Sequence, residues 1–99
     1  MAIKITRNAD DAIEFISRYG KGHSEGVVAK DKAVMKKFTE SIDAAAIFVN
    51  CSTRLHDGGI FGLGAEMGIS TGKLHARGPT GLKEITTYKW IAYGHGQIR

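Results

Sequence analysis

A glycine-rich stretch in the second half of the chain, FGLGAEMGISTGK at residues 61–73, has the composition of a phosphate-binding loop. The dinucleotide fingerprint G-x-G-x-x-G follows a strand and opens a helix. Gly62 and Gly64 fit its first half, but Met67 stands where the third glycine belongs. The residues before it, RLHDGGI, do not read as a strand either. The stretch therefore does not predict a dinucleotide site.

The same stretch also fails the phosphate-loop motif G-x-x-x-x-G-K-[ST]. Gly68 and Gly72 are one residue too close together. Leu74 occupies the position of the hydroxyl side chain that would bind magnesium. Neither nucleotide motif is present.

Cys51, the only cysteine of the chain, could act as a nucleophile with His56 or His75 as its base. Together with His56 and Asp57 it could also contribute to a metal site, but a second spaced ligand pair, typical of zinc sites, is missing. A cysteine at the end of an apolar strand is more often a small packing residue. We favour packing, and a miniature enzyme that uses Cys51 remains an alternative.

Arg54 and the Asp-Gly-Gly run at 57–59 carry the second candidate chemistry. A guanidinium recognises a carboxylate or phosphate with two parallel hydrogen bonds. Gly58 and Gly59 would allow backbone N–H groups to approach an anion closely. A solvated Asp-Gly turn explains the same residues equally well. On residue chemistry alone both interpretations stay open.

Alternating strands and helices precede these residues. Residues 2–6 alternate apolar and polar side chains, which predicts a strand. Asn8 is a plausible N-cap for a helix that Gly20 ends. Asp10 and Asp11 could form a catalytic carboxylate pair, but in the first helical turn we expect them to interact with the helix dipole.

The next helix is predicted to begin after Asp31, between strands at 26–30 and 44–50. Its apolar side chains recur at helical spacing and indicate a buried face. They are Val34, Met35, Phe38 and Ile42. The order β-α-β-α-β predicts an α/β fold with a parallel sheet and crossover helices.

Residues 51–78 are rich in Gly, Ser and Thr and show no long period, which is typical of a long functional or disordered loop. Gly78-Pro79 predicts a helix start, with Leu82 and Ile85 as its buried face. Residues 86–94 predict a final strand with bulky side chains on both faces.

Charge and composition restrict the partners. The 99-residue chain has a net charge of +4, but its 14 Lys and Arg are scattered and not interleaved with aromatic residues. This pattern disfavours nucleic-acid binding. No apolar run is long enough for a membrane span. Without signal-peptide organisation or a disulfide framework, the chain is predicted to be cytoplasmic.

The run STR…DGG…FGLGAE…GIST…HARGP.GL, together with DDAIEFISRYGKGHSEGVV before it and GQIR at the end, closely resembles gamma-glutamyl phosphate reductases. The resemblance covers essentially all residues and is strongest to the C-terminal region of that family. More distantly, a strand ending in VN, a glycine loop and a last helix and strand are similar to the aldehyde dehydrogenase superfamily. Because Met1 falls within an expected family strand, the chain is interpreted as an expressed fragment or truncated gene product.

The resemblance implies an activity for the parent enzyme. Such reductases convert gamma-glutamyl phosphate to glutamate 5-semialdehyde with NADPH, through a thioester on an active-site cysteine. The nucleophile and the cofactor domain lie upstream in the family, without counterpart here. The resemblance therefore implies no catalytic residue, no metal and no cofactor for this chain alone, and the remainder of the reductase chain as its partner.

The resemblance also divides the chain. Residues 1–78 are expected to belong to the catalytic domain, including the substrate loop 51–78, and residues 79–99 to form a terminal helix and oligomerisation strand. Residues 51–64 should face the glutamyl group of gamma-glutamyl phosphate or glutamate semialdehyde. Two sets of residues follow. The substrate-binding set is Ser52, Thr53, Arg54, Gly58 and Gly59, and the strand that makes a homo-oligomer carries Tyr88, Trp90, Ile91 and Tyr93. The alternative function is a stand-alone small α/β domain that binds an acidic metabolite or a partner chain.

Overall fold

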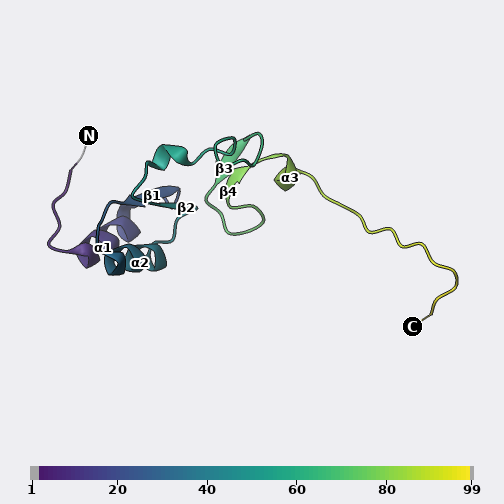
Figure 1. The fold of residues 1–99 in the computed structure, drawn as a ribbon, viewed down its shortest axis with the longest axis horizontal. Coiled ribbons are helices and arrows are strands. Elements are labelled where there is room, and N and C mark those ends of the chain that lie inside the picture. Colours follow the sequence, from purple (N-terminus) through teal and green to yellow (C-terminus); the bar gives the residue numbers. More distant parts are fainter. Residues whose placement is uncertain (1–2, 99) are drawn as a thin grey trace.

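Two parallel strands and two helices form the packed half of the molecule, in a computed structural model that describes residues 3–98. The elements of this half are α1 (Ala9–Tyr19), β1 (Ser24–Val27), α2 (Lys32–Ser41) and β2 (Ala46–Val49). β1 and β2 pair in parallel, with Ser24 opposite Ala46 and Val27 opposite Val49. Both helices lie on one side of this small sheet (Figure 1). The mixed α/β class is confirmed.

Both predicted N-caps are confirmed. The Asn8 side chain accepts a hydrogen bond from the Asp11 N–H at 2.9 Å, and Asp31 accepts one from the Ala33 N–H at 2.7 Å. Asp10 and Asp11 lie in the first turn of α1, where the helix dipole favours negative charge. The helix ends before Gly20, as predicted.

The strands differ from the prediction in extent. β1 begins two residues before the predicted strand 26–30, and β2 is the inner part of 44–50. The predicted strand 2–6 is wrong over the described residues 3–6, which have no regular structure, and Ala2 lies outside the described residues. A strand is stabilised by ladder hydrogen bonds, and no described segment pairs with this one. Ile5 is 92% exposed as a result.

The second half is a chain of short elements. They are the 3₁₀ helix η1 (Thr53–Leu55), β3 (Gly68–Ser70), β4 (Gly78–Thr80) and α3 (Leu82–Ile85). β3 and β4 pair antiparallel, so the segment 51–78 is less irregular than predicted. The predicted helix start at Gly78-Pro79 is wrong, because Pro79 lies in β4 opposite Ile69. A proline fits an edge strand, and the helix begins instead after Gly81, whose N–H donates to the Glu84 carboxylate at 2.8 Å.

Residues 86–98 contain no strand and run away from the rest of the molecule (Figure 1). The predicted strand 86–94 is therefore absent, since no described segment lies beside it. Trp90 and Tyr93 are 90% and 93% exposed. The predicted buried face of the last helix is also wrong, because Leu82 and Ile85 are exposed.

The molecule is open. Its radius of gyration is 19.4 Å, whereas a compact domain of this length has about 13 Å. Among the described residues the buried hydrophobic side chains are Phe38, Ile42 and Phe48. None of the helices in residues 3–98 is long and apolar enough to cross a membrane.

Candidate functional site

One face of the β1–β2 sheet carries the loop that the sequence singles out, residues 51–64. Side chains alternate along a strand, so Ser24 and Gly26 of β1 face the same side. A Cβ atom built on Gly26 would lie 3.3 Å from Cγ2 of Thr53 and 3.9 Å from Cβ of Phe48. η1 therefore packs across this face, and Gly26 provides the space for it.

Asn50 sets the direction in which the chain leaves β2. Its backbone is left-handed, with φ of 56°, a conformation that asparagine tolerates better than most residues. Its side chain accepts a hydrogen bond from the Ala29 N–H at 2.9 Å and donates one to the Ala29 carbonyl at 3.0 Å. Asn50 thus ties the carboxyl ends of both strands together. The sequence analysis missed this role, although an asparagine at a strand end is a signal for it.

Replacing Asn50 by alanine is expected to lower the free energy of unfolding by about 2–3 kcal/mol, from a left-handed alanine and two lost hydrogen bonds. Asn50→Gly keeps the backbone conformation at no steric cost and should lose about half as much. Urea denaturation of both variants, followed by circular dichroism, measures the difference. Equal losses would contradict a contribution from the left-handed backbone.

Ser52, Thr53 and Arg54 form the turn that follows. Ser52 Oγ accepts a hydrogen bond from the Arg54 N–H at 3.2 Å and caps η1. The Thr53 carbonyl accepts one from the His56 N–H at 3.1 Å. The Arg54 side chain is exposed and forms no ion pair within residues 3–98. Its guanidinium is available to an anion, whereas the Ser52 hydroxyl already serves the backbone.

The Asp-Gly-Gly run forms a tight turn. Asp57 Oδ1 accepts a hydrogen bond from the Ile60 N–H at 2.9 Å, and the Leu63 N–H donates to the Gly58 carbonyl at 2.8 Å. The Gly58 N–H donates to Oε2 of Glu66 at 2.8 Å, so this predicted anion-binding amide already binds a carboxylate. Gly59 is exposed, and its N–H makes no hydrogen bond within the described part of the chain.

His56 lies beneath this turn and is 8% exposed. Its Nδ1 is 2.5 Å from Ser24 Oγ, which is also 2.6 Å from Nδ1 of His23. Burial lowers the pKa of His56, the neighbouring His23 lowers it further, and Glu66 acts in the opposite direction. The structure therefore joins His56 to a serine and a second histidine, which the sequence analysis did not connect.

Cys51 is exposed and is not joined to either predicted base. His56 bonds to Ser24, and Nε2 of His75 lies 2.6 Å from the Glu84 carbonyl oxygen. Within residues 3–98 no three His, Cys, Asp or Glu side chains gather closely enough to hold a metal ion. The geometry gives Cys51 no activating partner among the described residues.

The glycine-rich stretch does not fit a dinucleotide. Gly62 and Gly64 adopt left-handed conformations in a turn, and Gly68 begins β3 where the fingerprint requires a helix. Lys73, which follows the last glycine of the stretch, pairs with Asp43 at 2.5 Å. Lys73 and then Arg77 hold the pKa of Asp43 below its usual value. The stretch forms a turn and then strand β3, and it does not have the arrangement of a phosphate cradle.

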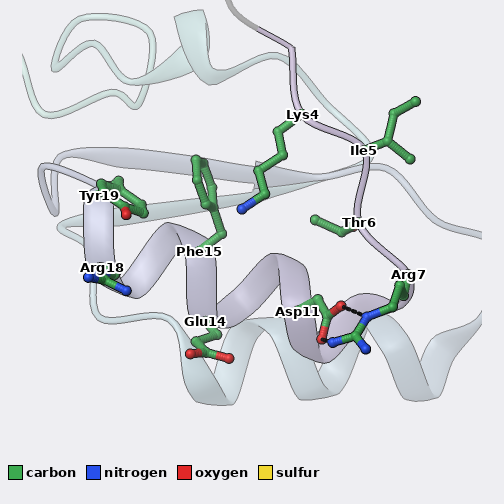
Figure 2. A pocket seen from close by; sticks show the side chains of 9 residues that line it. All are labelled: Lys4, Ile5, Thr6, Arg7, Asp11, Glu14, Phe15, Arg18 and Tyr19. Carbon is green, nitrogen blue, oxygen red and sulfur yellow. Dashed lines mark hydrogen bonds and ion pairs between the residues drawn. The ribbon is translucent and has the colours of Figure 1, made fainter.

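A cavity of about 380 Å³ lies between the N-terminal segment 4–7 and α1. Figure 2 shows its side chains: Arg7 pairs with Asp11 at 2.7 Å, and the Lys4 ammonium lies 4.2 Å from the centre of the Phe15 ring. Arg7 and Asp11 are thus already paired with each other, whereas Glu14 and Arg18, which also line the cavity, form no ion pair within residues 3–98. The cavity contains no residue of loop 51–64.

Curated relatives of the chain are gamma-glutamyl phosphate reductases. The enzyme of Carboxydothermus hydrogenoformans is 58% identical over 99 residues, which are 100% of this chain and 24% of that protein. The enzyme of Dehalococcoides mccartyi is 57% identical over 98 residues, 99% of this chain and 23% of that protein. No family model matches the sequence.

A solved structure is also similar. The crystal structure of the Thermotoga maritima gamma-glutamyl phosphate reductase matches with a TM-score of 0.89 and 54% identity, over 100% of this chain and 24% of that one. The open shape of the chain is therefore shared with a segment of a larger protein. The chain spans about a quarter of the length of the relatives that it matches.

Proposed function

We propose that the chain forms the C-terminal part of an NADPH-dependent reductase that converts gamma-glutamyl phosphate to glutamate 5-semialdehyde, a step of proline synthesis. The observation that carries the proposal is the likeness over the whole chain, at 54% identity and a TM-score of 0.89, to a reductase structure about four times longer. The open shape supports it, because the exposed apolar side chains would be covered by the remainder of that enzyme. Alone, the chain is expected to be inactive, and a cytoplasmic location is part of the proposal.

Within that enzyme, loop 51–64 would bind the acidic groups of the substrate. Ligands of open α/β sheets bind outside the carboxyl ends of the strands, and the loop begins where β2 ends. Arg54 and the Gly59 N–H are free to bind a carboxylate or phosphate, and Ser52 and Thr53 hold the turn that carries Arg54. Gly58 would bind the substrate only after Glu66 moves away.

The division of the chain follows from the same proposal. Residues 1–78 would belong to the catalytic domain, with substrate loop 51–78, and residues 79–99 would form the oligomerisation segment. Four exposed side chains would pair with a neighbouring subunit there. They are Tyr88, Trp90, Ile91 and Tyr93. The nucleophile and the NADPH site would come from the rest of the reductase.

An exchange of segments tests the proposal. The 99 residues of the Carboxydothermus hydrogenoformans reductase that match this chain are replaced by it, and phosphate-dependent NADP reduction with glutamate semialdehyde is measured. We expect activity within about tenfold of the parent. The parent with the segment deleted is the control and should be inactive. A folded, oligomeric chimera without activity would refute the proposal.

The second candidate is a stand-alone domain that binds an acidic metabolite through the free guanidinium of Arg54. The parallel sheet and its two helices give this function a small scaffold. Calorimetric titration of the chain with glutamate tests the second candidate. Absence of binding would exclude it, whereas binding that is lost in Arg54→Ala, together with an inactive chimera, would favour the stand-alone domain.

A further inference from the structure

The hydroxyl of Ser24 joins two imidazole rings. Ser24 Oγ lies 2.6 Å from Nδ1 of His23 and 2.5 Å from Nδ1 of His56. The two rings meet edge to face, with their centres 5.0 Å apart. Ser24 begins β1 and His56 follows η1, so this array is a direct polar link between the sheet and loop 51–64.

The rest of the His56 ring is enclosed by apolar groups. Its centre lies 5.8 Å from that of Phe48 in β2 and 6.3 Å from that of Phe61 in the loop. Nε2 is buried without a hydrogen-bond partner among the described residues. A Cβ atom built on Gly78 of β4 would lie 3.8 Å from Nε2, so this nitrogen faces the backbone of Gly78. His56 therefore lies between β1, the loop and Gly78 of β4.

The array suits a neutral His56 imidazole. The Ser24 hydroxyl has one proton, so it donates to one Nδ1 and accepts from the other. When Nδ1 of His56 is the group that donates to Ser24, a protonated His56 would carry a second N–H at Nε2, where the described residues offer no acceptor, and burial of an unpaired polar group is unfavourable. The neighbouring His23 also disfavours the charged form of His56 and lowers its pKa.

The other groups around His56 do little to offset this cost. Glu66 alone favours the proton, and its carboxylate is already bonded to the Gly58 N–H. Phe48, Phe61 and Gly78 are uncharged. Arg77, next to Gly78, pairs with Asp43 at 2.8 Å.

We infer that His23, Ser24 and His56 form a proton-sensitive latch, which holds loop 51–64 on the β1–β2 sheet while the His56 imidazole is neutral and releases it at mildly acidic pH. The latch is a property of the chain itself. Its consequence for substrate binding, the release of Arg54 from its position, rests on the proposed function.

The direction of the pH effect follows from proton uptake. The pKa of His56 is lowered in the folded chain, whereas the opened loop has an ordinary value of about 6.5. Above that pH neither state takes up the proton. As the pH falls below it, the open state binds the proton first, so the closed loop loses stability until the folded pKa is passed.

Hydrogen exchange of the chain between about pH 7.5 and pH 5.5, corrected for intrinsic rates, tests the latch. We expect the Leu63 N–H, bonded to the Gly58 carbonyl, to lose about tenfold in protection at the lower pH. The Ile42 N–H at the end of α2 should not change. His56→Phe keeps a ring in place and should abolish the pH response, whereas His95→Gln, in the exposed tail, should retain it.

Two results would overturn the latch: protection of Leu63 that is independent of pH, or a response of wild-type size in His56→Phe. If that variant fails to fold, titration of the His56 ring by NMR in the unmodified chain replaces it. A pKa at or above about 6.5 would then reject the latch, and a lower one that coincides with the loss of protection would support it. Because none of these measurements uses activity, failure of the latch and failure of the proposed function are distinguishable.

Discussion

Replacing Arg54 by alanine is expected to lower kcat/KM for glutamate 5-semialdehyde about a hundredfold in a reductase that carries this chain. The Arg54 guanidinium is exposed on loop 51–64 and has no ion-pair partner within residues 3–98. An arginine that binds a carboxylate or phosphate through two charge-assisted hydrogen bonds contributes more than a single neutral bond. Steady-state kinetics of the chimera, in the direction of semialdehyde oxidation, gives the ratio.

Two control variants separate geometry from charge. Arg54→Lys keeps the positive charge but loses the planar fork, and we expect it to recover only part of the activity. Lys30→Ala removes one positive charge from an exposed position outside the loop, so kcat/KM should remain within about twofold. Equal effects of Arg54→Ala and Lys30→Ala would show that Arg54 contributes only to the general basic field.

The first half of the fold was predictable because its signals are local. Asn8 and Asp31 lie three and two residues from the amides that they cap, and Gly20 directly follows the helix that it ends. Such side-chain to backbone bonds are decided within one turn of chain. The apolar spacing of α2 likewise identified Phe38 and Ile42, which are buried.

The predictions that failed depend on partners elsewhere. Residues 3–6 and 86–94 have strand-like patterns, but a strand exists only where a neighbour completes its hydrogen bonds, and none of the described segments does. Pro79 fits the preference for proline at the first position of a helix, yet it lies in β4, which pairs with β3. In both cases a non-local contact decides between structures that the local sequence allows.

The candidate site divides in the same way. Arg54 and Gly59 were identifiable by residue type, and both remain available to a ligand. Ser24 and His56 are 32 residues apart, and no local sequence pattern indicates that they form a hydrogen bond. The sequence predicted the Gly58 N–H as an anion-binding group, and only the structure shows that it donates to the Glu66 carboxylate. Residue chemistry therefore predicts which groups can bind, and the fold decides which of them are already engaged.

The link between packing and the site is Phe48, and replacing it by alanine is expected to destabilise the chain by about 3–5 kcal/mol. Phe48 is 5% exposed, and its ring lies 6.2 Å from that of Phe61 and 5.8 Å from that of His56. A domain of this length has about 5–15 kcal/mol of stability. With so few buried apolar side chains among the described residues, this chain should lie near the lower limit, so the variant should keep at most about 2 kcal/mol of stability and be partly unfolded at 25 °C.

Urea denaturation followed by circular dichroism measures the effect of Phe48→Ala against two variants. Tyr93→Ala also truncates an aromatic ring, but at a position that is 93% exposed, and should change the free energy of unfolding by less than about 0.5 kcal/mol. Phe48→Leu keeps most of the volume and should cost about 1 kcal/mol. A loss below about 1 kcal/mol for Phe48→Ala would mean that loop 51–64 does not depend on the sheet, because the ring that joins the two could then be removed without consequence.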